Sequence, residues 1–155
     1  MRYFEEILHN LGKELNLSLH PDQHGVCLLT VNNTLNIQLE WEEVKHHRLL
    51  IASFLCDIPP GPFREALLKE GLKMNGVFPR AGTFAFSARA QKCVFFTYVY
   101  PHQFQHIPTL IDLFSLFMQQ ALYWKSTLEK GSIPTMVPPS NLPPPAFFQP
   151  KTPTP

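Results

Sequence analysis

The sequence predicts one α+β domain with the order helix, three strands, helix, two strands, helix, followed by a proline-rich tail. Three observations support this. Apolar residues recur at helical spacing near both ends of the first 131 residues, short runs rich in Val, Ile, Phe and Tyr lie between them, and nine of the 23 residues from 133 to 155 are proline. We therefore expect a domain over residues 1–131, built on a twisted antiparallel sheet, and an extended tail over residues 132–155.

The first predicted helix covers residues 3–15. Its apolar side chains form a single stripe, and the charged residues lie off that stripe. The stripe consists of Phe4, Ile7, Leu8, Leu11 and Leu15.

Two strands follow, over residues 26–31 and 35–41, and Asn32-Asn33 joins them. Asparagine tolerates the positive φ angles of a two-residue hairpin loop. The second strand alternates apolar and polar residues, which is typical of a strand with one face in water. In the first strand, Val26 and Leu28 point to one face and Leu29 to the other, so both of its faces carry apolar side chains. The sequence does not say what covers its second face.

The remaining elements follow from similar patterns. Residues 48–56 form a third strand that is apolar on both faces, and residues 62–75 form a helix that starts with proline and that Asn75-Gly76 should close with a left-handed cap. Residues 83–88 and 94–100 form a second hairpin. The last helix covers residues 109–128, where Thr109 and Asp112 have the spacing of an N-terminal capping pair.

Composition excludes several classes of protein. Thirteen basic and twelve acidic residues leave a net charge of +1, which argues against nucleic-acid binding. We expect no cleaved secretion signal, because the N-terminus lacks a basic start followed by an apolar core, and no membrane insertion, because no uncharged apolar run nears about 20 residues. Three widely spaced cysteines in apolar runs indicate buried thiols in the cytoplasm rather than a disulfide framework.

The sequence offers little for catalysis, and we expect no enzyme activity, catalytic residue, metal or cofactor. Cys27 or Cys93 could pair with a histidine as a nucleophile, but thiols inside strand runs usually pack in the core. His102 and His106, with His46 and His47, could bind a metal, but a solvated loop is the simpler interpretation. The Glu40, Glu42 and Glu43 run could supply acid–base groups, and a charged turn is again simpler.

The tail leaves two interpretations open. Its repeated prolines between residues 138 and 145 could bind an aromatic groove of a partner, or they could serve as a spacer. Phe147 and Phe148 follow them, and two adjacent apolar side chains on a tail suggest an anchoring contact.

The order of elements and several short motifs resemble the class I type III secretion chaperones of the Tir-chaperone type. The resemblance rests on "FEEILHNLGKELNLSL", "PDQHGVCLLTVNNTLNIQLEW" and "ALYWKSTLEKG", and it covers residues 3–130. Its most telling pieces are a Leu-Gly-x-x-Leu-x-Leu end to the first helix, Gly25-x-Cys27 at the start of the first strand, Leu39-Glu40 at the end of the second and Trp124 in the last helix.

The resemblance implies a small cytoplasmic bacterial homodimer that binds the N-terminal chaperone-binding segment of one or more secreted effectors in extended form. The secretion ATPase is a further candidate partner. Implied effector-binding residues are Phe4, Ile7, Leu8, Leu11, Val26, Leu28, Leu29, Leu50 and Phe54, and implied dimer-interface residues are Phe63, Leu67, Leu68, Leu72, Phe84 and Phe86. The chain is nearly neutral, whereas the family is usually acidic. The alternative function is an adaptor whose proline-rich tail recruits a partner domain.

Overall fold

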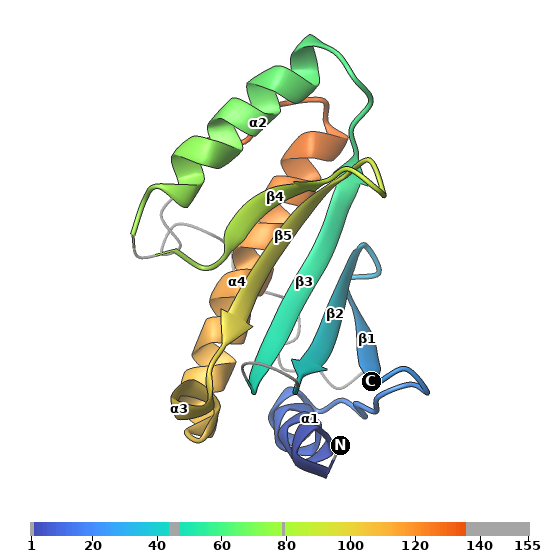
Figure 1. Ribbon diagram of the computed structural model, residues 1–155, viewed down its shortest axis with the longest axis vertical. Coiled ribbons are helices and arrows are strands. Elements are labelled where there is room, and N and C mark those ends of the chain that lie inside the picture. The colour runs from blue at the N-terminus through green and yellow to red at the C-terminus, as the bar shows by residue number, and fades with distance from the viewer. Residues whose placement is uncertain (1, 44–46, 79, 136–155) are drawn as a thin grey trace, which may run out of the picture.

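A five-stranded antiparallel sheet, in the order β1-β2-β3-β5-β4, organises the chain (Figure 1). The computed structural model describes residues 2–43, 47–78 and 80–135. Its elements are α1 Arg2–Leu15, β1 Val26–Val31, β2 Leu35–Glu42, β3 Arg48–Asp57, α2 Pro62–Asn75, β4 Thr83–Ser87, β5 Lys92–Val99, α3 Pro101–Phe104 and α4 Ile107–Glu129.

The two predicted hairpins are present. Asn32 and Asn33 have φ angles of 52° and 56°, so both adopt the left-handed conformation that a tight two-residue turn requires. β2 then pairs with β3 only from Gln38 to Glu42, so the turn end of the first hairpin is not paired with β3. This local separation of β2 from β3 leaves an opening beside the end of β3.

One face of the sheet carries the core, and α4 packs across it. The rings of Phe95 on β5 and Phe117 on α4 stack with centroids 5.0 Å apart, and both residues are buried. Three edge-to-face aromatic contacts of 5.4–5.7 Å join Tyr3 of α1, Trp41 of β2 and Phe104 of α3. The long helix and these contacts together fix α1 and the sheet as one unit.

α2 lies along the outer edge of β4, where it bonds to the backbone of the strand through one side chain. The Asn75 side chain accepts a hydrogen bond from the Phe84 amide at 2.7 Å and donates one to the Phe84 carbonyl at 2.8 Å. Gly71 allows the close approach, because a Cβ at this position would lie 1.9 Å from the Phe84 ring. The sheet therefore has one covered edge, at β4, and one edge strand, β1, with no further strand beside it among the described residues.

The predicted fold class is confirmed, with four local corrections. A one-turn helix, α3, precedes the last helix, and α4 begins at Ile107 rather than Thr109, because Pro108 fits the first turn of a helix. Thr109 therefore lies inside the helix and does not cap it with Asp112 as predicted, and its hydroxyl is 2.8 Å from Nδ1 of His106, the residue that precedes the helix. The predicted left-handed cap at Asn75-Gly76 is wrong, because Gly76 has φ −82° and Asn75 bonds to β4 instead.

Candidate functional site

The sheet has a second face, which we call the open face, and α4 does not cover it. Directly opposed residues of antiparallel strands point to the same side, so the pairing assigns the residues of this face. Its central positions are Val26, Leu28 and Thr30 on β1, Asn36, Gln38 and Glu40 on β2, Leu50, Ala52 and Phe54 on β3, and Val94, Phe96 and Tyr98 on β5.

The open face answers the question posed by the two-sided apolar pattern of the first strand. Leu29 is buried against the core, whereas Leu28 keeps 68% of its surface exposed. On β3, Phe54 is 45% exposed and Leu50 is half-buried. Within the described residues, nothing covers the second face of β1. Leu28, Leu50, Phe54 and the half-buried Val26 form what we call the open-face patch.

The structure divides the predicted effector-binding residues into two groups. Val26, Leu28, Leu50 and Phe54 lie together on the open face. The other five are buried. Four of them belong to the stripe of α1, which faces the core and not a groove, and Leu29 faces the core from β1. Their burial removes them from any surface on which a partner could dock in this conformation. These five are Phe4, Ile7, Leu8, Leu11 and Leu29.

The predicted dimer residues divide in the same way. Leu67 and Phe84 are buried between α2 and β4, and Leu68 and Phe86 are half-buried. Phe86 also lies under the Arg64 guanidinium, whose central carbon is 4.5 Å from the ring centroid. Only Phe63 and Leu72 are exposed.

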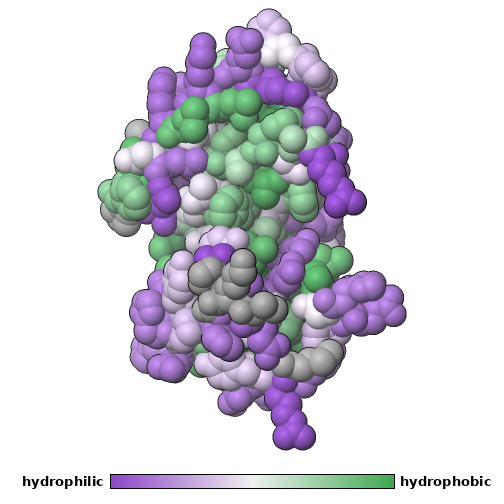
Figure 2. All heavy atoms as spheres, in the orientation of Figure 1, coloured by the Kyte–Doolittle hydropathy of each residue, from purple (hydrophilic) through white to green (hydrophobic). Residues whose placement is uncertain are grey.

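Two exposed apolar residues near α2 were not predicted. Val77 and Phe78 come just after α2 and Gly76, and Phe78 is 74% exposed. Together with Phe63 and Leu72 they form what we call the α2 patch. Figure 2 shows hydrophobic residues gathered along α2 and over the sheet beside it. The sequence signal was available, because an apolar pair directly after a helix-ending Asn-Gly lies where a polar turn is usual.

The tail residues Phe147 and Phe148 lie outside the described residues, as does His46. Among residues 2–43, 47–78 and 80–135, no three His, Cys, Asp or Glu side chains are grouped so that they could hold a metal ion. In the same ranges, no helix has the length and apolar character needed to cross a membrane.

The candidate nucleophiles and acid–base groups have structural partners. Burial raises the pKa of the Cys27 thiol, which opposes formation of a nucleophilic thiolate. Glu42 pairs with Arg48, and the Arg48 guanidinium lies 3.5 Å from the centroid of the Tyr98 ring. Glu40 accepts a hydrogen bond from the Gln38 amide at 3.1 Å. These contacts favour charged surface over a catalytic site.

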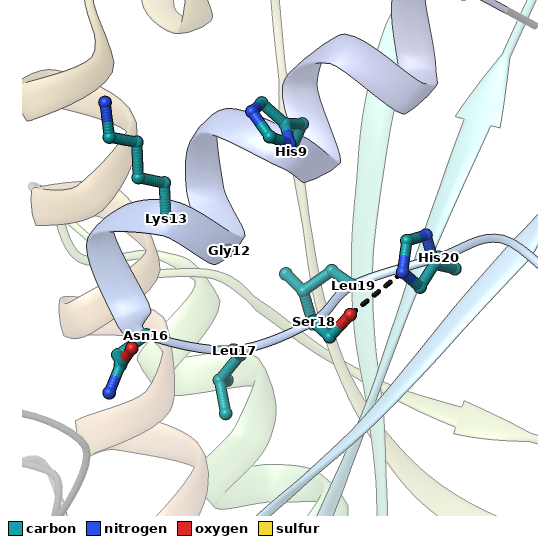
Figure 3. A pocket seen from close by; sticks show the side chains of 8 residues that line it. All are labelled: His9, Gly12, Lys13, Asn16, Leu17, Ser18, Leu19 and His20. Carbon is teal, nitrogen blue, oxygen red and sulfur yellow. Dashed lines mark hydrogen bonds between the residues drawn. The ribbon is translucent and has the colours of Figure 1, made fainter.

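A shallow pocket lies between the C-terminal half of α1 and the segment that follows it (Figure 3). Gly12 makes the reversal of the chain possible, since a Cβ there would lie 2.5 Å from the Leu17 carbonyl oxygen. Ser18 and His20 hydrogen-bond across 2.9 Å, while Lys13 points away from them (Figure 3). The polar groups therefore do not converge on one point, and the pocket has the character of a turn rather than a ligand site.

We compared the sequence and the fold with those of known proteins. No curated protein matches the sequence. Solved structures do share its fold. A chain of the HopA1–SchA chaperone–effector complex is 19% identical, with a TM-score of 0.64 over 80% of this chain and 94% of that one.

Two further structures are similar. The crystal structure of the Yersinia pestis type III secretion chaperone SycH with a stable fragment of YscM2 gives 12% identity and a TM-score of 0.56, over 77% of this chain and 97% of that one. A chain of the ExsC–ExsE complex is 16% identical, with a TM-score of 0.55, and the match covers 79% of this chain and 91% of that one. Residues 6–125 match the family described as Tir chaperone protein (CesT). This match covers most of the chain and confirms the resemblance found in the sequence, so the protein belongs to the Tir chaperone protein (CesT) family of class I type III secretion chaperones.

Proposed function

We propose that this protein is a type III secretion chaperone that acts in the bacterial cytoplasm and binds the N-terminal chaperone-binding segment of secreted effectors. Family membership supports the class, and the three similar structures are described as a chaperone–effector complex, a secretion chaperone with a protein fragment and a two-protein complex. The observation that carries the proposal to particular residues is the exposed Leu28 on an edge strand.

An extended client suits this position for two reasons. β1 has no further strand beside it among the described residues, so a client strand could add to its edge through backbone hydrogen bonds. Leu28, Phe54 and their neighbours on the open face could then receive alternate apolar side chains of the client. Backbone bonding would tolerate several client sequences, and the open-face patch would select among them.

The binding would be noncovalent, with no reaction catalysed. A client held in this way stays extended, since its backbone is paired with the sheet rather than with itself. That state would keep the client competent for secretion, as the family resemblance implies. The secretion ATPase is a further proposed partner, as the family resemblance implies.

We also propose that the protein is a homodimer and that the α2 patch is its contact surface. Phe63, Leu72, Val77 and Phe78 are exposed apolar side chains on one helix and the loop that follows it. Such clustering commonly marks an interaction surface. The two patches lie on different elements, so one could remain free for a client while the other is covered by the second copy.

The test is to purify the full-length protein from its native bacterium and identify the bound polypeptide by mass spectrometry. We expect the N-terminal region of a secreted protein, and Leu28→Glu should reduce its recovery at least about tenfold, since a buried apolar anchor would be replaced by a charge. Leu116→Glu, which places the same charge at a 37% exposed leucine on the outer side of α4, is the control. Deletion of residues 136–155, which keeps Ile133 packed against the core, should leave recovery unchanged, and complete loss on that deletion would support the adaptor function instead.

A further inference from the structure

Two of the three cysteines lie side by side in the sheet. Cys56 at the end of β3 and Cys93 near the start of β5 are Cα partners across the antiparallel ladder, just after a register shift between Phe54 and Cys56. Opposed residues in such a ladder have Cα atoms about 4.5–5.5 Å apart, which lies within the range that a disulfide spans. The two thiols also lie close enough for each to shift the pKa of the other. Cys27 lies on β1, the strand at the far edge of the sheet.

The two thiols differ in their surroundings. Cys93 is fully buried, whereas Cys56 is half-buried. Interaction with the Cys93 thiol lowers the pKa of Cys56, and Lys125 lowers it further, although burial, Asp57 and Glu129 oppose this. The same interaction, together with burial, raises the pKa of Cys93. Cys56 is therefore the thiol that would ionise first, and Cys93 would remain protonated beside it.

Cys56 is also the thiol that a reagent can reach. The separation of β2 from β3 leaves a depression of about 390 Å³, and Cys56, Phe54 and Leu28 are among the residues that line it. Lys125 and Lys92 line it as well. Lys125 Nζ donates to the Leu55 carbonyl at 3.1 Å and lies 3.0 Å from Glu129, and Lys92 lies 3.6 Å from Asp57.

We propose that Cys56 and Cys93 form a thiol–disulfide exchange site, in which Cys56 is the attacking thiol and Cys93 the resolving thiol. The co-reactant is a small disulfide such as oxidised glutathione, one sulfur of which would reach Cys56 through the depression that Lys92, Lys125 and Asp57 line. The proposal does not rest on the proposed chaperone function.

The exchange has two steps. The Cys56 thiolate attacks one sulfur of oxidised glutathione, so a protein–glutathione disulfide forms and one glutathione thiolate leaves and takes up a proton. Cys93 then loses its proton and attacks the Cys56 sulfur, and the second glutathione leaves. Two protein thiols are oxidised and one molecule of oxidised glutathione is reduced to two of glutathione.

The resulting disulfide would close a loop that contains all of α2 and β4. Closing a loop of this length restricts the unfolded chain, so the oxidised protein should unfold at a temperature roughly 10 °C higher. The intermediate would place a glutathionyl group in the depression beside Leu28 and Phe54.

The test treats the full-length protein with oxidised glutathione, quenches it at intervals, and maps the modified cysteines by mass spectrometry. Wild type and Cys27→Ser should lose two hydrogen atoms and link the peptides of Cys56 and Cys93. Cys93→Ala should stop with one glutathionyl group on Cys56. Cys56→Ser should leave Cys93 unmodified.

Circular dichroism identifies any variant that fails to fold. In that case the wild-type time course alone shows which cysteine is modified first and which two become linked. A glutathionyl group on Cys56 that appears before the disulfide supports the assignment. A disulfide that involves Cys27, first modification at Cys93, or no reaction of the folded wild type would overturn it.

Discussion

Replacing Gly71 with alanine should loosen α2 from β4. A Cβ at this position would lie 1.9, 2.4 and 2.8 Å from three carbons of the Phe84 ring. The ring cannot move aside easily, because Phe84 is buried and its centroid lies 4.8 Å from that of Trp124, which is buried behind it. The substitution therefore forces α2 and β4 apart.

The expected loss of stability in Gly71→Ala follows from two opposing effects. Overpacking of this severity costs about 3 kcal/mol, and alanine improves helix propensity over glycine by about 1 kcal/mol. The net loss is about 2 kcal/mol, which corresponds to a fall in Tm of about 8 °C for a domain of this size. Because α2 carries the α2 patch, displacement of the helix should also weaken the proposed dimer.

Thermal unfolding followed by circular dichroism gives the comparison. Gly76→Ala is the matched control, since a Cβ there meets nothing closer than 3.5 Å and the φ of −82° suits any residue. Its Tm should stay within about 2 °C of wild type. A Gly71→Ala protein as stable as wild type, or more stable, would refute the close packing of α2 on Phe84.

Three further predictions test other parts of the structure. Leu8→Asp should lower the free energy of unfolding, measured by denaturant titration, by at least about 4 kcal/mol, because a carboxylate would replace a fully buried side chain. Native stability with lost client binding would instead support the predicted effector groove along α1. Leu72→Glu should reduce the mass measured by light scattering from dimer to monomer while leaving Tm nearly unchanged, and an unchanged dimer would exclude Leu72 from the contact. Asp22 accepts backbone hydrogen bonds from Val26 and His24, which lower its pKa below the ordinary 3.8. Its contribution to stability is therefore present above pH 3.8 and is lost as the pH falls through the folded-state pKa. Asp22→Asn should therefore be less stable than wild type at pH 7, with a difference that shrinks below pH 3.8, and a constant difference would contradict this role.

Local patterns were enough to predict most of the fold. Helical stripes, alternation along β2 and the Asn32-Asn33 turn each depend on neighbouring residues, so the sequence displays them directly. The end of α2 was mispredicted for the opposite reason. Asn75 bonds to Phe84 of β4, and this tertiary contact replaces the local cap that Asn75-Gly76 suggested.

The candidate site was predictable only in part. A stripe such as that of α1 shows which side chains share a face, but it does not show whether the face meets a core or a partner. The structure gives Leu8 to the core and Leu28 to the surface, although both are leucines in apolar patterns. The difference arises because the stripe of α1 packs on the core, whereas nothing among the described residues covers the face of β1 that carries Leu28, and no local pattern encodes either arrangement.

The most direct test of the proposed function compares clients recovered from the native bacterium by wild type, Leu28→Glu and Leu116→Glu. Hydrogen exchange on the recovered complex locates the protected segment of the client and the protected strands of the chaperone. We predict protection in the N-terminal region of a secreted protein and along β1, with recovery lost in Leu28→Glu and kept in Leu116→Glu. Full recovery by Leu28→Glu, with no added protection of β1, would contradict client binding on the open face.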